Sequence, residues 1–338
     1  MDGFNTLPLT NGRTANAYPY AYVARKYVAP YWAMASQYVL ADHMFPTMFG
    51  PSFTGHLDLI AGTTDLNPAS AEVDGPTGHP WGCDAPQGTL TFVLNPQRHE
   101  SSGPFPCFTQ FRTLADTLDA AHVSWHYYAP PISQPSNGGI WSEFDAIRNV
   151  RYGRDWHNVI SPQTRVLADA RNGKLPGVSW VIPDALDSDH VGGNDVYGPS
   201  WVASVVNAVG TGPDWKSTAI VVVWDDWGGW YDSVSPPQRD FRGLGIRVPC
   251  IVVSPYAKAG RVSHTEYEFG SIVKLVEQVF RLPPLGTLAE GYTETRANSM
   301  LDNFDFRQKP RAFRTIPAPQ PASFFLRRAP SYRLPDDD

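Results

Sequence analysis

The spacing of apolar and polar residues changes along the chain and predicts strands that alternate with helices. Four apolar, β-branched or aromatic runs predict strands at residues 123–128, 178–183, 219–224 and 249–254. Helical spacing of apolar residues predicts helices at residues 113–121, 200–209 and 266–281, and at residues 21–41 with an interruption at Pro30. Residues 1–20 are polar and irregular. This alternation predicts a parallel sheet covered by helices on both faces.

The strand predicted at residues 219–224 carries the most information, because two adjacent acids, Asp225 and Asp226, follow it directly and precede a Gly-Gly turn. The run predicts a fully buried, parallel strand. Ligands in open α/β sheets lie beyond the carboxyl ends of the strands. Two carboxylates there repel each other unless a cation or a proton offsets their charge. The segment therefore predicts a divalent metal held by oxygen ligands; the alternative is a turn acid or helix cap beside an ordinary strand.

A second segment places a serine behind a sharp turn. Gly50 and Pro51 impose the turn, Ser52 follows it, and His56 lies at the start of the apolar run that comes next. A serine near a helix N-terminus can attack phosphorus while backbone N–H groups hold the phosphoryl oxygens. The alternative is an ordinary N-cap serine.

Two histidines follow other strand patterns. His190 ends the acidic segment after the strand at 178–183, and it could donate to a phosphoryl oxygen or protonate a leaving group. His264 precedes the last helix, where Thr265 or Ser263 with Glu268 resembles a capping box. For His190 a solvated acidic loop is the competing interpretation, and the capping box explains the neighbours of His264 but not His264 itself. The other histidines, position 43 among them, have no spacing that distinguishes them from core or surface residues.

Composition narrows the class of protein. A formal charge of −6 and a pI of about 5.8 exclude a typical nucleic-acid-binding surface. No apolar stretch approaches the roughly 20 residues needed to span a bilayer, and the N-terminus does not resemble a signal peptide. We expect a single domain over residues 1–305, with a Pro-, Gly- and Ser-rich surface excursion at 66–110, and a Pro- and Arg-rich tail over 306–338 that wraps the surface.

The three cysteines indicate one disulfide. Cys83 and Cys107 lie in loop-like surroundings and could close a short loop, whereas Cys250 lies in a predicted strand and should act as a small apolar residue. A disulfide suits an exported protein, which conflicts with the absence of a signal peptide.

Taken together, these motifs resemble the bacterial phosphoesterase family of phospholipases C and related acid phosphatases. The resemblance rests on Gly50-Pro51-Ser52-Phe53, Ser188-Asp189-His190, Asp225-Asp226 with the Gly-Gly turn, and Ser263-His264-Thr265. It runs from about residue 17 to about residue 306 in the family's order. It implies an alkaline-phosphatase-like three-layer α/β/α sandwich with a mostly parallel central sheet.

The resemblance also implies roles for residues. Ser52 would be the nucleophile that becomes phosphorylated, and Asp225 and Asp226 would hold one divalent metal ion: Ca, Mg, Mn or Fe. His190 would contact the phosphoryl group, and His264 matches a further catalytic position. Gly50 and His56 belong to the nucleophile motif and are expected to contact substrate.

Two departures from the family pattern stand out. Ser233 replaces a histidine that commonly follows the Gly-Gly turn, so a ligand or its partner is expected to be lost. Nothing before Tyr18 resembles the family's first strand and the Glu-Asn pair after it, which supply metal ligands. We therefore expect the chain to lack that N-terminal strand. Full-length members of the family are expected to be secreted or periplasmic.

The function expected from these observations is metal-dependent hydrolysis of a phosphoester through a phosphoserine intermediate. The substrate would be a phospholipid head group or a phosphomonoester. The alternative is a truncated, catalytically impaired relative that at most binds phosphorylated ligands. No sequence pattern specifies an oligomeric state.

Overall fold

A computed structural model describes residues 1–9, 12–132, 142–190 and 197–329 of the chain. The strands are β1 (Val39–Phe45), β2 (Asp65–Asn67), β3 (Ser70–Asp74), β4 (Phe92–Leu94), β5 (Glu100–Ser102), β6 (Trp125–Tyr128), β7 (Val159–Ile160), β8 (Val178–Val181), β9 (Ile220–Val223), β10 (Val248–Val253), β11 (Arg261–Ser263) and β12 (Tyr267–Glu268). The α-helices are α1 (Ala29–Gln37), α2 (Ser52–Ala61), α3 (Leu114–Ala120), α4 (Arg148–Arg151), α5 (Arg165–Arg171), α6 (Gly198–Thr211), α7 (Phe269–Phe280) and α8 (Ala322–Arg327). This mixture confirms the predicted α/β class.

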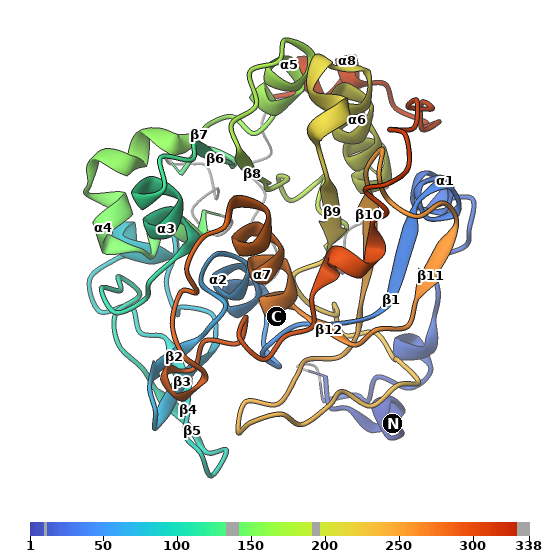
Figure 1. Ribbon diagram of the computed structural model, residues 1–338. Helices are drawn as coiled ribbons and strands as arrows, with labels where there is room; N and C mark the ends of the chain where they lie inside the picture. Colours follow the sequence, from blue (N-terminus) through green and yellow to red (C-terminus); the bar gives the residue numbers. More distant parts are fainter. Residues whose placement is uncertain (10–11, 133–141, 191–196, 330–338) are drawn as a thin grey trace.

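The largest sheet is mixed rather than parallel. Its strand order is β11-β1-β10-β9, and β12 also pairs with β1 (Figure 1). β10 is antiparallel to both β1 and β9, whereas β11 and β12 are parallel to β1. The prediction of a buried parallel strand before Asp225 was therefore wrong in two respects, because β9 pairs antiparallel and its residues are only half-buried at the sheet edge.

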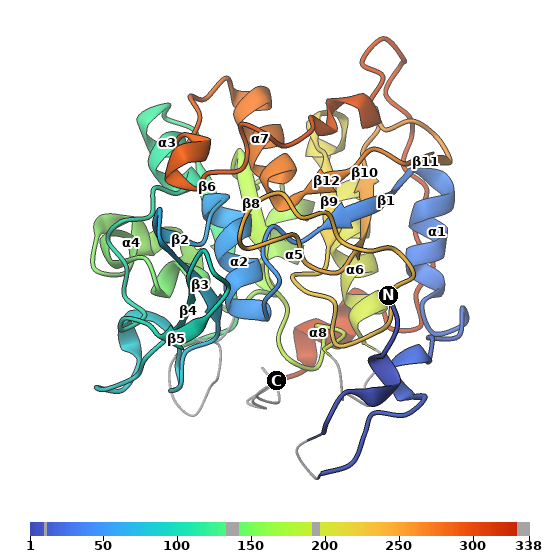
Figure 2. The ribbon, with the colours of Figure 1, turned by 90° about the horizontal axis from the view of Figure 1, so that it is seen from below.

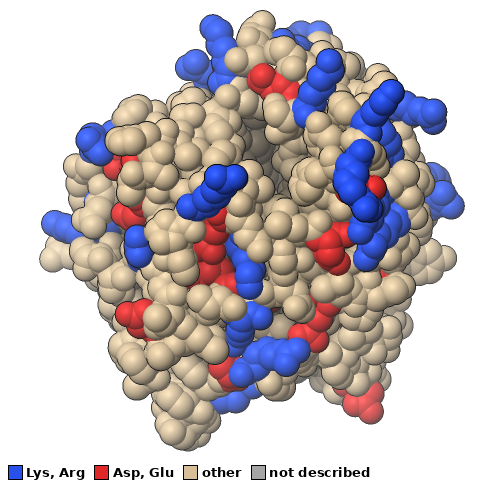
Figure 3. All heavy atoms as spheres, viewed as in Figure 1, with Lys and Arg blue, Asp and Glu red and all other residues tan. Residues whose placement is uncertain are grey.

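A second sheet, of order β7-β6-β8, is parallel throughout, as the strand–helix alternation predicted. Its edge strand β8 is half-buried along its whole length, like β9. Between these two strands Figure 1 leaves an open space, and the space-filling view has a hollow at the same place (Figure 3). The same view shows acidic and basic side chains interspersed, with Lys and Arg gathered on the side of α1 and β11.

Two hydrophobic clusters hold the helices against the sheets. One packs α1, α5 and α6 on the mixed sheet and includes Met34, Leu167 and Val206, while the other packs α2 and α3 on the parallel sheet through Leu57 and Leu118. Each of these side chains is almost completely buried. α2 also packs along α7, so the helix that begins at the predicted nucleophile is enclosed by the core.

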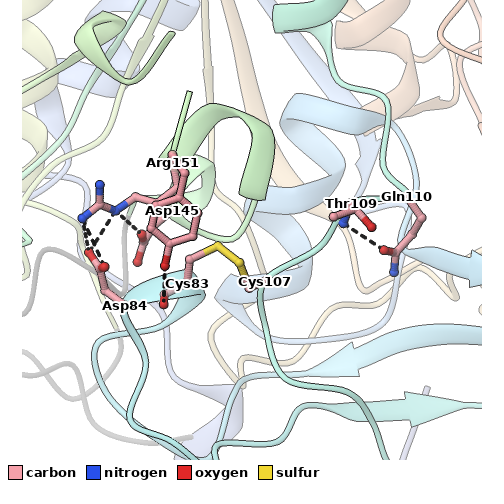
Figure 4. The surroundings of a disulfide bond; sticks show 8 residues. Cys83, Asp84, Cys107, Thr109, Gln110, Asp145 and Arg151 are labelled. Atoms are coloured by element: carbon pink, nitrogen blue, oxygen red, sulfur yellow. Dashed lines mark hydrogen bonds and ion pairs between the residues drawn. A yellow bond between two sulfur atoms is a disulfide. The ribbon is translucent and has the colours of Figure 1, made fainter. Parts of the chain in front are cut away.

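Residues 66–110 contain more regular structure than predicted. Strands β2 to β5 form an antiparallel sheet, and Figures 1 and 2 both place it on the side of α2 away from the mixed sheet. The predicted disulfide between Cys83 and Cys107 is confirmed (Figure 4). Beside it, the Arg151 guanidinium bridges Asp84 at 2.8 Å and the buried Asp145 at 3.1 Å. The disulfide closes a loop within the segment, and the ion pair between Asp84 and Arg151 fastens that loop to α4.

Helix boundaries depart from the sequence pattern at two places. Pro30 occupies the first turn of α1 and begins the helix instead of interrupting it, because proline lacks the N–H that a first turn leaves unused. The predicted capping box before α7 was wrong: Glu268 is itself the N-cap and pairs with Ser271, whereas Thr265 donates to Asp302. The helix predicted at residues 113–121 begins as expected, since Thr113 is its N-cap and forms a capping box with Asp116.

The described part of the tail lies against α6. The Asn207 side chain exchanges two hydrogen bonds with the backbone of Ile316, at 2.9 and 2.8 Å, and Phe325 of α8 packs against Trp201. None of the described helices combines the length and the apolar character needed to cross a membrane.

Candidate active site

Ser52 begins α2 directly after the Gly50-Pro51 turn, and it is 7% exposed. A Cβ at Gly50 would collide with the Thr54 side chain and with the backbone oxygen of Val73 on β3. Close packing is thus sufficient to explain glycine at this position. Pro51 is the extended N-cap residue, and its carbonyl accepts the first hydrogen bonds of the helix from the N–H groups of Thr54 and Gly55.

The two acids after β9 lie against this helix. Ser52 Oγ donates to Asp226 Oδ2 at 3.1 Å, and His56 Nε2 lies 3.3 Å from Asp225 Oδ2. Since Ser52 and His56 are four residues apart, they lie on the same face of α2 and both meet the acid pair. The other oxygen of Asp226 accepts from the Gly228 N–H at 2.7 Å, which fixes the carboxylate with the Gly-Gly turn.

A glycine that the sequence analysis did not select allows this approach. A Cβ at Gly55 would collide with the backbone oxygen of Asp225, and it would also lie too close to the carbonyl carbon and the Cβ of Asp225. Any larger residue would push α2 away from the acid loop. Glycine in the middle of a helix is unfavourable by about 1 kcal/mol relative to alanine, and this position gives it a packing reason.

The electrostatics of the acid pair favour a negative charge on Asp225. Burial alone opposes ionisation, but the hydrogen bond and charge of His56, with a hydrogen bond from Ser52, lower its pKa from 3.8 to about 2. The Oδ2 atom of Asp225 is buried and has no hydrogen-bond partner of good geometry. A buried carboxylate of this kind can bind a cation.

Behind His56 lies a buried tyrosine. The Tyr127 hydroxyl is 3.4 Å from His56 Nδ1 and accepts from the Glu143 backbone N–H at 3.4 Å. Burial raises the pKa of Tyr127 well above 10, so the hydroxyl keeps its proton and can donate it to Nδ1. This contact holds the His56 ring on one side while Nε2 faces Asp225 on the other.

The two remaining predicted histidines lie in other surroundings. His264 contacts Asp42 through Nδ1, at 2.8 Å to Oδ2, in a group with His43. The backbone N–H of His190 donates to Ser188 Oγ at 3.2 Å. The carboxylate of the neighbouring Asp189 accepts from Tyr31 Oη of α1 at 2.6 Å. The structure thus brings Ser52, His56 and the acid pair together, while the roles assigned to the other two histidines stay predictions.

Ser233, which stands where the family commonly has a histidine, directly follows Asp232, and Asp232 is held by an ion pair with Arg247. Asp232 makes a bidentate ion pair with Arg247, at 2.7 and 2.8 Å, and Arg247 also donates to the backbone oxygen of Asp42 at 2.9 Å. The end of the Gly-Gly turn is therefore tied to β1 without a histidine.

The N-terminal residues contribute aromatic contacts that the sequence analysis missed. Phe4 lies edge-on to Trp227 and Tyr231, with ring centroids 5.9 and 5.3 Å apart, and Tyr20 contacts Tyr231 at 4.8 Å. Phe49, which precedes the nucleophile turn, packs on Trp227 at 5.8 Å. Aromatic residues from three segments therefore enclose the loop that carries the acids.

Comparison with known proteins decides the family. The sequence model of the phosphoesterase family matches residues 9–283. The chain belongs to this family. It is 27% identical to phospholipase C B of Mycobacterium tuberculosis over 286 residues, which are 75% of the chain and 52% of that protein. It is 24% identical to the non-hemolytic phospholipase C of Pseudomonas aeruginosa over 298 residues, covering 77% of the chain and 40% of that protein.

The chain thus spans about half the length of these curated relatives. Among solved structures, it resembles a protein of the alkaline phosphatase superfamily from Vibrio parahaemolyticus with a TM-score of 0.47 and 12% identity. That match covers 81% of the chain and 65% of the solved protein. The predicted family is confirmed by the sequence match.

Proposed function

We propose that this protein hydrolyses phosphoesters with Ser52 as the nucleophile. The contact between Ser52 Oγ and Asp226 Oδ2, at 3.1 Å across 174 positions of sequence, carries the proposal. It places a hydroxyl at a helix N-terminus beside two carboxylates, in a chain of the phosphoesterase family. Family membership and the phospholipase C relatives support the reaction class.

In the proposed first step, Ser52 Oγ forms a bond to phosphorus as the bond to the leaving alcohol breaks. Asp226 accepts the hydrogen bond of the hydroxyl, orients Oγ for attack and would take its proton as the bond to phosphorus forms. His190 would protonate the departing alkoxide. Water then cleaves the phosphoserine and restores the hydroxyl.

The residues present fit a divalent cation. Asp225 and Asp226 offer carboxylate oxygens and Ser52 a hydroxyl oxygen, a set of hard ligands suited to Mg²⁺, Ca²⁺ or Mn²⁺. The buried Oδ2 of Asp225 has no hydrogen-bond partner of good geometry. When bound, such an ion would lower the pKa of the serine hydroxyl and offset the charge that develops on the phosphoryl oxygens.

His56 would act through Asp225. Its Nε2 contacts the carboxylate on one side, and Tyr127 holds its other ring nitrogen. We therefore assign it a positioning role in place of the direct substrate contact expected from the sequence.

The test compares Ser52→Ala with Ser36→Ala, a control serine on the exposed side of α1. Hydrolysis of p-nitrophenyl phosphate, of bis(p-nitrophenyl) phosphate and of phosphatidylcholine vesicles would be measured with Mg²⁺, Ca²⁺ or Mn²⁺ supplied. Loss of the covalent route should lower kcat about a thousandfold or more for the substrate that the unaltered protein turns over. A Ser52→Ala variant that retains a tenth of the rate would overturn the assignment.

A further inference from the structure

Two imidazoles converge on the carboxylate of Asp42, which lies within β1 of the mixed sheet. His43 Nδ1 lies 2.7 Å from Asp42 Oδ1, and His264 Nδ1 lies 3.0 and 2.8 Å from the two oxygens of Asp42. The two histidine rings are 6.1 Å apart and nearly perpendicular. Within the described part of the chain, these residues form the group of three whose potential ligand atoms all lie within 4.8 Å of one another.

The pairing of strands creates this group. β1 and β11 are parallel, and Ala41 is registered with Ser263. The next residues along the two strands, Asp42 and His264, therefore emerge side by side although 222 positions separate them. The backbone of Asp42 is also held, since its carbonyl accepts from Arg247.

The group is open to solvent on one side. The side chain of His264 is 72% exposed, and those of His43 and Asp42 are 33% and 28% exposed. Water could complete a coordination shell without any movement of the core. Arg247, which donates to the Asp42 carbonyl, is neutralised by its bidentate pair with Asp232, so it does not repel an approaching metal ion strongly.

We propose that Asp42, His43 and His264 bind a divalent transition-metal ion of the Zn²⁺, Co²⁺ and Ni²⁺ class. Imidazole nitrogen with one carboxylate oxygen is a donor set that these ions prefer, in contrast to the all-oxygen set at Asp225 and Asp226. Two ligands on a tetrahedral ion, each about 2.0–2.1 Å from it, are about 3.4 Å apart. The observed separations of 2.7 to 3.0 Å between each imidazole nitrogen and Asp42 would have to open by about 0.4 to 0.7 Å.

Binding requires each imidazole to offer the lone pair of Nδ1. A neutral ring does so by carrying its proton on Nε2. The ion would then link β1 to the segment between β11 and β12. None of these three ligands belongs to the group formed by Ser52, His56 and the acid pair, so zinc binding can be measured separately from hydrolysis.

The experiment uses the full chain without a polyhistidine tag, since a tag would bind the same ions. Isothermal titration with ZnCl₂ would measure affinity, and the visible absorption of bound Co²⁺ would report histidine and carboxylate ligation. The variants are His264→Ala and His43→Ala, and the control is His99→Ala, which removes an exposed loop histidine. Circular dichroism would confirm that each variant is folded.

The unaltered protein and His99→Ala should bind one Zn²⁺ equally well. Removing a residue that hydrogen-bonds to a metal ligand typically weakens metal binding 10- to 100-fold. Removing a ligand itself, as in His264→Ala and His43→Ala, should therefore weaken Zn²⁺ binding at least about tenfold. The Co²⁺ spectrum should disappear in the same variants. Folded protein that takes up no Zn²⁺, or that binds it equally well without His264, would overturn the site, while Asp225→Asn should leave Zn²⁺ affinity unchanged.

Discussion

Replacing Arg242 by methionine should destabilise the protein more than any nearby surface change. The Arg242 side chain is 1% exposed and lies 2.8 Å from Asp240 Oδ2 and 3.2 Å from Asp65 Oδ1. It also donates to the backbone oxygen of Gly291 at 3.1 Å and to Thr63 just beyond α2. The network thus holds the C-terminal end of the helix that begins at Ser52.

The expected magnitude follows from what the substitution leaves behind. Methionine fills much of the volume but leaves Asp65, whose side chain is 8% exposed, without its cation. Asp240 keeps Arg296 at 2.6 Å and loses less. Removing one partner of a buried ion pair costs about 3–5 kcal/mol, because the remaining charge stays desolvated. We expect the free energy of unfolding to fall by that amount.

Arg239→Met is the matched control. Arg239 lies three residues earlier and pairs with Glu266, but its side chain is 51% exposed. Exposed pairs contribute about 0–1 kcal/mol, so this variant should be close to the unaltered protein. Urea denaturation followed by tryptophan fluorescence would measure both. Equal losses in the two variants, or a loss below about 1 kcal/mol for Arg242→Met, would refute the reasoning that burial decides the effect.

Three further outcomes are expected. Reduction of the Cys83–Cys107 disulfide, which closes a separation of 24 residues, should lower the free energy of unfolding by roughly 3 kcal/mol, and an unchanged melting temperature in reductant would contradict this. Asp225→Asn and Asp226→Asn should each weaken Mg²⁺, Ca²⁺ or Mn²⁺ binding in titration calorimetry, and unchanged affinity in both would assign the acids another purpose. Glu72→Gln should remove a pH dependence of stability, because burial raises the pKa of Glu72 to about 8. Folding therefore favours its protonated form, and this contribution is present below about pH 4.5 and is lost as the pH rises to about 8. The free energies of unfolding of the variant and the unaltered protein, measured by urea denaturation, should diverge by several kcal/mol between pH 5 and pH 9 in the variant's favour. Parallel pH profiles would show that Glu72 does not carry the effect.

The sequence contained enough local information to select the acid pair and the serine. A strand that ends in two acids, and a Gly-Pro turn before a helix, are short-range patterns, and the structure brings Ser52 to Asp226. Family motifs identified His190 and His264, but they did not show that His264 contacts Asp42. That contact depends on which strands pair, and no local pattern specifies the partner of β1.

The direction of β9 relative to its neighbours could not be predicted from the sequence for the same reason. The apolar run of β9 fits a buried strand in either direction, and only its tertiary pairing with β10 makes it an antiparallel edge. Gly55 could have been found as an unusual glycine within a predicted helix, but the backbone that it accommodates, that of Asp225, is 170 positions away. The irregular N-terminal residues gave no signal, because their aromatic contacts join separate segments.

The proposed covalent intermediate can be observed directly. The protein would be mixed with a phosphoester that it hydrolyses, quenched in acid within one turnover, digested and analysed by mass spectrometry. The account predicts a single phosphoryl group on Ser52, absent after Ser52→Ala and present after Ser36→Ala. Rapid turnover with no phosphorylated peptide, or with the phosphoryl group on another residue, would contradict it.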